Sequence, residues 1–316
     1  MSNLRAAVIG VGYLGRFHAQ KYAALEGVDL VGVVDVDLAR AQEVAQEVGC
    51  TAYTDYRPLL DKVDLVSIVV PTQYHYQVAR ACLEADIHIL LEKPVTQTVA
   101  EAEDLIRLAA ERNRVFQVGH LERFNPAVVA LAGVLKNPMF IESHRMAPYK
   151  PRGTDVNVVL DLMIHDIDII LTLAKSDLKL VNSVGVPVIS DEVDIANARL
   201  QFESGCVANV TASRVSVDAM RKVRIFQPDA YITIDYQARK IGIFRKGGEG
   251  MPLPMIPNVT LEERRFEQGD SLMDEIKSFV RSIREGLPPV VSGEDGKRAL
   301  AVALEINAKL APQGPM

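Results

Sequence analysis

Short apolar runs alternate with amphipathic stretches through the first 120 residues of the chain. The runs are rich in β-branched residues, and the stretches between them repeat apolar residues at the period of a helix. Strands that are apolar on both faces are typical of a parallel sheet covered by helices on both sides. The pattern predicts a doubly wound α/β domain of the Rossmann type over residues 1–120, with strands at 4–10, 28–35, 50–53, 64–71, 87–92 and 114–120.

The pattern changes at about residue 121. One helix is expected after the Arg-Phe-Asn-Pro segment at 123–126, and a longer one over 156–174. Alternating strands then follow as hairpins between residues 196 and 246, and two helices close the chain at 270–286 and 293–310. We therefore predict an α+β second domain over 121–316, with a large, mostly antiparallel open sheet. A resemblance to a known family, described below on the motifs that carry it, further implies that this domain binds substrate and forms oligomer contacts, and that its last helix returns to the first domain.

Composition narrows the function. The hydrophobic fraction is 48%, the charged fraction 24% and the net charge −6, which argues against nucleic acid and anionic membranes as partners. No apolar run is long enough to span a bilayer, and the N-terminus enters a strand directly, so no membrane insertion is expected. Three widely spaced cysteines favour neither a disulfide framework nor a structural zinc site, and indicate a cytoplasmic protein.

A glycine turn follows the first predicted strand and opens the first predicted helix. Gly10, Gly12 and Gly15 have the spacing of a dinucleotide-binding turn. Gly10 permits the tight turn, Gly12 lets the backbone approach a pyrophosphate, and Gly15 lets helix and strand pack closely. We predict that this turn, with Tyr13 and Leu14 inside it, binds the cofactor phosphates at the helix N-terminus. A glycine turn without a ligand is the alternative.

Asp35 ends the second predicted strand, where a carboxylate can accept hydrogen bonds from the adenosine ribose. A carboxylate there would repel a 2′-phosphate, so the sequence favours NAD as the cofactor. Asp37 and Arg40 lie close by and keep NADP as the less favoured alternative.

Two further strand ends carry candidate cofactor contacts. Pro71 and Thr72 follow the fourth strand, at the edge where open parallel sheets bind ligands, and His75 comes soon after. We expect these residues to contact the cofactor. The equally favoured alternative is a helix start in which Thr72 is the N-cap and His75 lies on an exposed first turn.

The stretch His-Ile-Leu-Leu-Glu-Lys-Pro places a charge pair at the carboxyl end of the fifth strand. We expect Glu92 and Lys93 to line the crevice where a nicotinamide ring would lie. A partly desolvated lysine can act as a base or donate a hydrogen bond to a substrate hydroxyl. Pro94 would fix the backbone there, with a cis bond as one way to do so. An ion pair that only ends a strand is the alternative.

A second group of reactive side chains lies on the apolar helix over 156–174. Asp161, His165 and Asp168 are four and three residues apart, which places them on one face. Asp166 is expected to face solvent or to pair with some other group. A histidine oriented by carboxylates is a general acid/base near neutral pH. A metal site is the weaker alternative, because no further ligands are apparent, and none is predicted.

The glycine turn, Glu92-Lys93-Pro94 and the Asp161-x-x-x-His165 helix together resemble the glucose–fructose oxidoreductase / inositol dehydrogenase (Gfo/Idh/MocA) family over nearly the whole chain. The resemblance implies NAD(P)-dependent oxidation of a secondary alcohol on a sugar or cyclitol. His165 would take the hydroxyl proton, Lys93 would hydrogen-bond to the same oxygen, and Asp161 would hold the substrate or the imidazole. It does not decide whether Lys93 or His165 is the base.

The segments between these motifs suggest a substrate. Residues 118–127 resemble the bacterial branch of the family that oxidises the 3-hydroxyl of UDP-N-acetylglucosamine, on the route to 3-amino sugars of lipid A-type glycolipids. That route makes an aminotransferase a candidate partner. Residues 143–157 are expected to form a basic loop that grips a diphosphate through arginine and stacks tyrosine on uracil or sugar, or else an ordinary solvated loop. The predicted substrate contacts are His120, Arg123, Arg145, Tyr149, Arg152, Asp161 and Asp168.

Two other functions stay open. A dehydrogenase of a small free sugar or cyclitol would not need the basic segment, and an NAD-binding sensor would not need an intact set of Lys93, Asp161 and His165. The predicted sheet between residues 196 and 246 would expose one apolar face, so a homodimer or homotetramer is expected.

Overall fold

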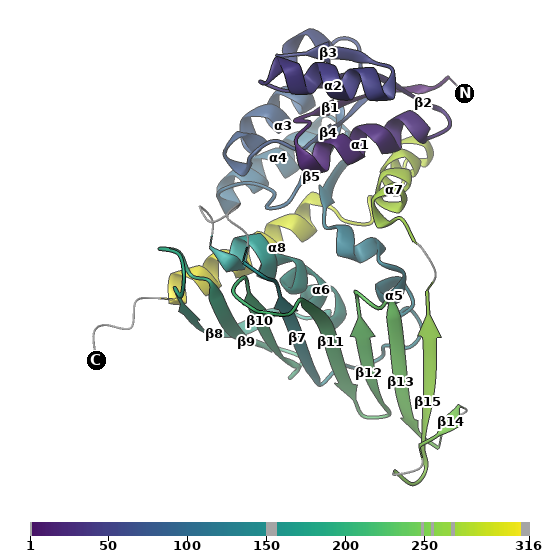
Figure 1. The fold of residues 1–316 in the computed structure, drawn as a ribbon, viewed down its shortest axis with the longest axis vertical. Coiled ribbons are helices and arrows are strands. Elements are labelled where there is room, and N and C mark those ends of the chain that lie inside the picture. Colours follow the sequence, from purple (N-terminus) through teal and green to yellow (C-terminus); the bar gives the residue numbers. More distant parts are fainter. Residues whose placement is uncertain (1, 150–156, 248–249, 254–255, 267–268, 311–316) are drawn as a thin grey trace. The chain divides into compact units, whose positions relative to one another are not determined.

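The computed structural model describes residues 2–149, 157–247, 250–253, 256–266 and 269–310 (Figure 1). The chain forms two compact units. The first contains Met1–Leu121 and Asp270–Leu300, and the second contains Glu122–Gly269 and Ala301–Met316. The chain thus leaves the first unit near the predicted boundary. The chain returns to the first unit at Asp270. The sequence predicted this return only for the last helix, which begins later.

The first unit is built on a six-stranded parallel sheet with the strand order β3-β2-β1-β4-β5-β6. This order reverses between β1 and β4, which is the switch point where doubly wound sheets bind ligands. All four side chains of β4 are buried, as expected for a strand covered on both faces. The strands are β1 (Leu4–Ile9), β2 (Val28–Val34), β3 (Thr51–Tyr53), β4 (Leu65–Ile68), β5 (His88–Glu92) and β6 (Phe116–Gly119).

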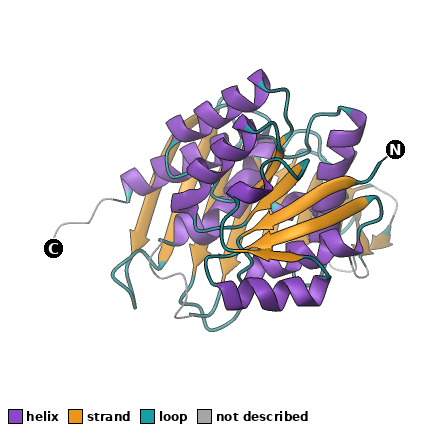
Figure 2. Ribbon diagram, turned by 90° about the horizontal axis from the view of Figure 1, so that it is seen from above, coloured by secondary structure: helices purple, strands orange, loops and turns teal. Residues whose placement is uncertain are grey.

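Helices pack on the strands of this sheet (Figure 2). Local signals set their ends: Asp37 caps α2 through two backbone N–H groups, and Thr98 and Glu101 form a capping box on α4. The apolar stripe of α7 joins the core formed by α1 and the sheet, which is why the chain returns to this unit. The helices are α1 (Tyr13–Ala24), α2 (Leu38–Val48), α3 (His75–Glu84), α4 (Val99–Glu111) and α7 (Ser271–Glu285), with short turns η1 (Arg57–Leu59) and η2 (Thr72–Tyr74).

The second unit contains a nine-stranded sheet with the order β14-β15-β13-β12-β11-β7-β10-β9-β8 (Figure 1). Adjacent strands in this sheet are antiparallel, except that β7 and β10 are parallel to each other. The predicted mixed α/β fold is confirmed, although β7, β8 and β15 were not anticipated as strands. The strands are β7 (Phe140–Met146), β8 (Leu178–Val186), β9 (Ile195–Phe202), β10 (Val207–Ser213), β11 (Met220–Gln227), β12 (Ala230–Asp235), β13 (Lys240–Lys246), β14 (Met251–Pro252) and β15 (Val259–Arg265).

The two faces of this sheet differ. Helix α6 (Ile164–Ala174) packs on the face that holds the buried side chains of β7 and β10. The other face carries a ladder of stacked rings from Phe140, Phe226, Tyr231 and Phe244, with successive centroids 5.7, 4.7 and 5.0 Å apart. The remaining helical segments are η3 (Leu121–Phe124), α5 (Pro126–Val129), η4 (Val159–Met163) and α8 (Gly293–Lys309), and α8 begins in the first unit and ends in the second. Among the described residues, no helix has the length and apolar character that crossing a membrane requires.

Candidate active site

The glycine turn has the geometry that a dinucleotide requires. Gly10 has a φ of +89°, and a Cβ atom there would lie 2.5 Å from the carbonyl oxygen of Val69. A Cβ atom on Gly15 would lie 1.9 Å from the carbonyl oxygen of Gly10, so helix and turn approach too closely for any side chain. Gly12, by contrast, has no described atom within 4 Å of such a position, and it caps α1 without a side-chain hydrogen bond. The open space at the N-terminus of α1 suits a pyrophosphate.

Asp35 lies just beyond β2, at the carboxyl edge of the sheet, and is 7% exposed. Its carboxylate accepts hydrogen bonds from the backbone N–H groups of Val11, at 3.1 Å, and Asp37, at 3.0 Å. Arg40 contacts both carboxylate oxygens at 3.2 and 3.3 Å. Asp35 therefore connects the glycine turn to the end of β2. Arg40, one of the two residues that kept NADP open as an alternative cofactor, is paired with Asp35.

His75 does not lie on an exposed helical turn. It is 1% exposed, and its ring nitrogens lie 2.8 Å from the carbonyl oxygens of Pro94 and Val70. Burial lowers its pKa. The short helix η2 has Pro71 as its N-cap and Thr72 as its first residue, so the alternative N-cap role of Thr72 is also wrong. Because both ring nitrogens face backbone carbonyls, His75 ties the end of β4 to the segment after β5.

Glu92, the last residue of β5, and Lys93, which follows it, differ in burial. Lys93 is half-buried and precedes a cis peptide bond to Pro94, which confirms the cis option. Glu92 is buried instead of lining a crevice: its Oε1 lies 3.3 Å from Nε2 of the fully buried His18. Its Oε2 accepts the backbone N–H of Lys93 at 3.3 Å. Glu92 thus faces into the unit and holds the backbone from which the Lys93 side chain starts.

The predicted reactive helix begins as a π-helical turn, η4, and continues as α6. The side chain of Asn157 accepts hydrogen bonds from the backbone N–H groups of Val159 and Leu160, which starts the helix. Asp161 lies in the π-helical turn and His165 on the first turn of α6, and both are half-buried. π-Helical turns often occur at functional sites, because they re-aim side chains within a helix.

Asp166 is buried and paired, so the expectation of a solvent-facing side chain is wrong and the paired alternative is correct. It is 2% exposed and accepts hydrogen bonds from Ser143 Oγ at 2.8 Å and Arg145 Nε at 2.6 Å. Arg145 also donates to Glu122 at 3.1 Å. Burial alone would lower the pKa of the Arg145 guanidinium, but Asp166 and Glu122 outweigh burial and raise it.

These contacts remove Arg145 from the predicted basic loop. Residues 140–146 form strand β7, so neighbouring side chains point to opposite faces of the sheet. Arg145 is 3% exposed on the helix-covered face, and its guanidinium is held by carboxylates instead of being open to a diphosphate. Tyr149 is exposed just beyond the strand, and Arg152 lies outside the described residues.

Two other predicted substrate contacts bind each other. Arg123 donates to both carboxylate oxygens of Asp168, each at 2.7 Å, in a pair that is almost completely buried. This pair joins η3 to α6 and occupies both carboxylate oxygens of Asp168. His120 is 1% exposed at the end of β6. The carboxyl ends of the parallel strands therefore bring together Gly10, Gly12, Gly15, Asp35, Pro71, Thr72, Lys93 and His120 in the first unit.

Comparisons with known proteins agree with this description. A family model for oxidoreductases with an NAD-binding Rossmann fold matches residues 4–120, and the model of the Gfo/Idh/MocA C-terminal domain matches residues 135–232. A UDP-N-acetylglucosamine 3-dehydrogenase from Acidithiobacillus ferrooxidans is 42% identical over 309 residues, covering 97% of each chain. The chain belongs to the Gfo/Idh/MocA oxidoreductase family. Its first unit is the NAD-binding Rossmann domain of that family.

Family members of known structure extend the comparison. The crystal structure of the Acidithiobacillus dehydrogenase superposes with a TM-score of 0.94 at 41% identity and covers 98% of both chains. A myo-inositol 2-dehydrogenase from Thermotoga maritima is 27% identical over 97% of this chain and 96% of its own. A scyllo-inositol dehydrogenase from Lactobacillus casei, solved with NAD(H) and scyllo-inositol, has a TM-score of 0.81 at 21% identity over 98% of this chain and 97% of its own, and shares the fold.

Sequence reasoning missed two buried ionisable residues of this Rossmann domain. His18 on α1 and Glu275 on α7 are both 0% exposed, and their side chains approach Glu92. Each stands among apolar neighbours that form the inward face of its helix. In the sequence, an ionisable residue on the apolar stripe of a predicted helix indicates a buried polar group. It does not indicate which residue on another element that group contacts.

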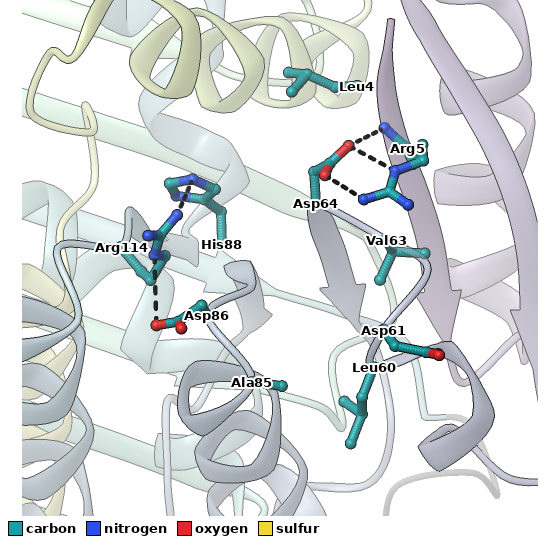
Figure 3. A pocket seen from close by; sticks show the side chains of 10 residues that line it. All are labelled: Leu4, Arg5, Leu60, Asp61, Val63, Asp64, Ala85, Asp86, His88 and Arg114. Atoms are coloured by element: carbon teal, nitrogen blue, oxygen red, sulfur yellow. Dashed lines mark hydrogen bonds and ion pairs between the residues drawn. The ribbon is translucent and has the colours of Figure 1, made fainter.

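A polar cavity of about 440 Å³ lies at the opposite, amino-terminal edge of the parallel sheet (Figure 3). The two arginines that line it are paired: Arg5 binds Asp64, and Arg114 approaches His88 at 3.4 Å. The backbone N–H of Val115 donates to Nδ1 of His88 at 2.8 Å, and burial lowers the pKa of His88 to about 4. The cavity is lined by Leu4, Arg5, Leu60, Asp61, Val63, Asp64, Ala85, Asp86, His88 and Arg114. Because its arginines bind or approach other residues of the same cavity, we interpret the cavity as structural.

Proposed function

We propose that the protein oxidises the 3-hydroxyl of UDP-N-acetylglucosamine to a 3-keto sugar, with NAD as the hydride acceptor. The observation that carries this proposal is the 42% identity, over 97% of the chain, to a dehydrogenase named for that reaction. The inositol dehydrogenase of comparable coverage is 27% identical. Oxidation of a free cyclitol is therefore the second candidate.

The proposed reaction assigns a task to each candidate residue. Gly12 and Asp35 would hold NAD, which when bound would supply the acceptor for the hydride that leaves the carbinol carbon. His165 takes the hydroxyl proton, so that the C–O bond becomes a carbonyl as the C–H electron pair departs. Lys93 hydrogen-bonds to the same oxygen and stabilises its developing negative charge. Asp161 holds the substrate or the imidazole.

Two features of the geometry support these roles. Lys93 follows a backbone held by Glu92 and His75, so its starting point is rigid. His165 precedes Asp166, which is anchored to Arg145 and Ser143. Preorganised groups are what a reaction centre needs, because reorganisation would otherwise add to the barrier. We do not carry Arg145, Arg123 or Asp168 forward as substrate contacts, since each is engaged in a buried ion pair.

The test is the absorbance of NADH after the protein is mixed with NAD and UDP-N-acetylglucosamine. Glutamate and an aminotransferase that consumes the 3-keto product keep the equilibrium from stalling. His165→Ala should abolish the signal and keep NAD binding. The control is His144→Ala, because His144 lies on β7 with its side chain on the opposite face from Arg145. Competition by UDP alone would support a nucleotide-sugar site.

Other results would redirect the proposal. Turnover of inositols or free sugars, with none of the UDP-sugar, would establish the second candidate. NAD binding without turnover of any alcohol would favour a sensor. Comparing Lys93→Met with His165→Ala across pH separates the two possible bases, because only loss of the base removes the limb that reports its titration.

Three wider assignments belong to the same proposal. We infer a cytoplasmic enzyme whose keto product is consumed by an aminotransferase on a route to lipid A-type glycolipids. We also infer a homodimer or homotetramer formed through the sheet face that carries the ring ladder of Phe140, Phe226, Tyr231 and Phe244. Sedimentation of the protein beside a Tyr231→Glu variant tests this interface.

A further inference from the structure

Three ionisable side chains meet in the interior of the first unit, directly behind Lys93. They are His18 on α1, Glu92 at the end of β5 and Glu275 on α7. One ring nitrogen of His18 and one carboxyl oxygen of each glutamate lie within 4.8 Å of one another. Their exposed fractions are 0, 9 and 0%. Ionisable groups are seldom buried together unless their charges are compensated, and the reaction proposed above assigns none of the three a role.

A chain of polar contacts sets the tautomer of His18. The Tyr22 hydroxyl lies 2.9 Å from Ser67 Oγ, which in turn lies 3.1 Å from Nδ1 of His18. Ser67 is the acceptor available to the buried phenol, whose pKa is raised by burial, so Ser67 donates onward to Nδ1. The ring proton of His18 is then on Nε2, which faces Oε1 of Glu92 at 3.3 Å.

The negative charge belongs on Glu92. Its two oxygens face the His18 ring and the backbone N–H of Lys93. Neither carboxyl oxygen of Glu275 has a hydrogen-bond partner among the described residues. Burial first, and then the charge of Glu92, raise the pKa of Glu275 well above the ordinary value of a glutamate. Two carboxylates this close cannot both ionise at low cost, so Glu275 keeps its proton.

Other polar and charged groups lie close to the cluster. Gln117 on β6 donates to the backbone oxygen of Glu275 at 3.1 Å, which leaves the carboxyl group itself unbound. His75 on α3, which acts electrostatically on the same cluster through Glu92, has its pKa lowered by burial. Lys93 is the cation next to Glu92 in the chain. These groups, with Tyr22 and Ser67, are polar neighbours that come from α1, α3, α7, β4, β5 and β6.

We propose that His18, Glu92 and Glu275 are a positioning network for Lys93, in which Glu92 carries the charge, His18 orients it and Glu275 is a neutral carboxylic acid behind it. The network acts through one contact: Oε2 of Glu92 holds the peptide N–H of Lys93. The inference deepens the proposed function, because it concerns the residue that would bind the reacting oxygen.

Gly119 supplies an independent observation. A Cβ atom at this position on β6 would lie 2.7 Å from Oε1 of Glu92 and 2.8 Å from its carboxyl carbon. The glycine therefore leaves the space that the Glu92 carboxylate occupies. Gly119→Ala would displace that carboxylate without changing any charge in the network.

A bound cation is the alternative occupant of the cluster. It would require both glutamates to be ionised and would remove the proton that the geometry assigns to Glu275. The two readings make opposite predictions for Glu275→Gln: an amide can replace a neutral carboxylic acid, but it cannot replace a charged ligand.

The experiment compares the wild-type protein with Glu275→Ala, Glu275→Gln, His18→Leu and Gly119→Ala. Glu285→Ala is the matched control, because Glu285 lies on the exposed side of the same helix. The rate at which a succinimidyl ester acylates Lys93 is followed across pH by peptide mass spectrometry. Infrared spectroscopy detects the protonated carboxyl group, and elemental analysis detects any metal. The kcat and KM of sugar oxidation are measured across pH on the same proteins.

We expect Glu275→Ala, His18→Leu and Gly119→Ala to lower kcat about tenfold or more with the KM for NAD within about twofold, since misplaced reacting groups cost rate before affinity. The same variants should change the pH profile of Lys93 acylation. Glu275→Gln should restore both readouts to near the wild-type values and lose the infrared band of the carboxylic acid.

Three results would overturn the inference. The first is a Glu275→Gln variant as impaired as Glu275→Ala, and the second is a stoichiometric metal whose removal inactivates the wild-type protein. The third is unchanged Lys93 acylation in both His18→Leu and Gly119→Ala. The acylation and infrared readouts need no sugar, so they decide the network even if UDP-N-acetylglucosamine is not oxidised. If His18→Leu does not fold, Gly119→Ala decides in its place.

Discussion

The ion pair between Arg145 and Asp166 should be a main support of the second unit. The Arg145 and Asp166 side chains are 4% and 2% exposed, and Nε lies 2.6 Å from the carboxylate oxygen. Arg145→Met removes the cation and leaves the carboxylate of Asp166 buried with Ser143 as its donor. Breaking a buried pair in this way costs about 3–5 kcal/mol, whereas an exposed pair contributes about 0–1 kcal/mol.

The chain offers a matched exposed pair on the same sheet. Arg224 on β11 contacts Glu142 on β7 at 2.7 Å, with side-chain exposures of 46% and 24%. Arg224→Met should therefore cost less than about 1 kcal/mol. Amide hydrogen exchange in β7 and α6, read by mass spectrometry, measures the opening free energy locally. That matters because a protein with two units need not unfold in one step.

We expect Arg145→Met to speed exchange in β7 and α6 by about a hundredfold or more, since each 1.4 kcal/mol is a factor of ten. Arg224→Met should change it by about fivefold or less. Equal effects of the two substitutions would refute the structural role of Arg145. A large rise in the KM for UDP-sugar with unchanged exchange would restore the diphosphate contact that the basic segment first suggested.

Two further predictions concern the first unit. Gly12→Ala should leave the melting temperature unchanged but weaken NAD binding about tenfold or more, because its methyl group meets no protein atom; Gly15→Ala should lower both, because it collides with the carbonyl of Gly10. His88, whose pKa is lowered to about 4, stays neutral in the fold while the unfolded chain takes up a proton below about pH 6.5. The free energy of unfolding should therefore fall as the pH drops from about 6.5 to 4, by about 1–2 kcal/mol after allowance for solvent screening. Urea unfolding at pH 7 and pH 4.5 measures this loss, and His88→Gln should make it smaller.

The Rossmann unit was predictable because its signals are local. Strand burial, the glycine spacing and the acid at the end of β2 all depend on residues within one turn or strand. Strand β7 was not recognised because its inward positions include Ser143 and Arg145, so its alternation does not look apolar. Ser143 donates a hydrogen bond to Asp166, and the carboxylates of Asp166 and Glu122 compensate the charge of Arg145. No local sequence pattern reports such partners on other elements.

The same limit explains why the positions of strand-end residues were predictable. Gly10, Gly12 and Lys93 follow strand ends, and topology alone brings them to one edge. Glu92 and His75 also follow this rule, yet both side chains turn inward, because they find their partners in the interior: His18 for Glu92, and two backbone carbonyls for His75. Position at a strand end thus predicts the location of a residue but not the direction of its side chain.

Two of the candidate catalytic residues, Lys93 and His165, are anchored in the same way. Lys93 follows Glu92, and His165 precedes Asp166. Each neighbour is a buried carboxylate that lies against a histidine or arginine side chain from another element. The reactive side chain stays half-buried while the adjacent residue fixes its backbone. Such an arrangement separates positioning from chemistry, because the anchoring carboxylate does not need to touch the substrate. Substituting either anchor should therefore lower kcat with little change in KM, whereas loss of a contact made equally in the ground and transition states would raise KM.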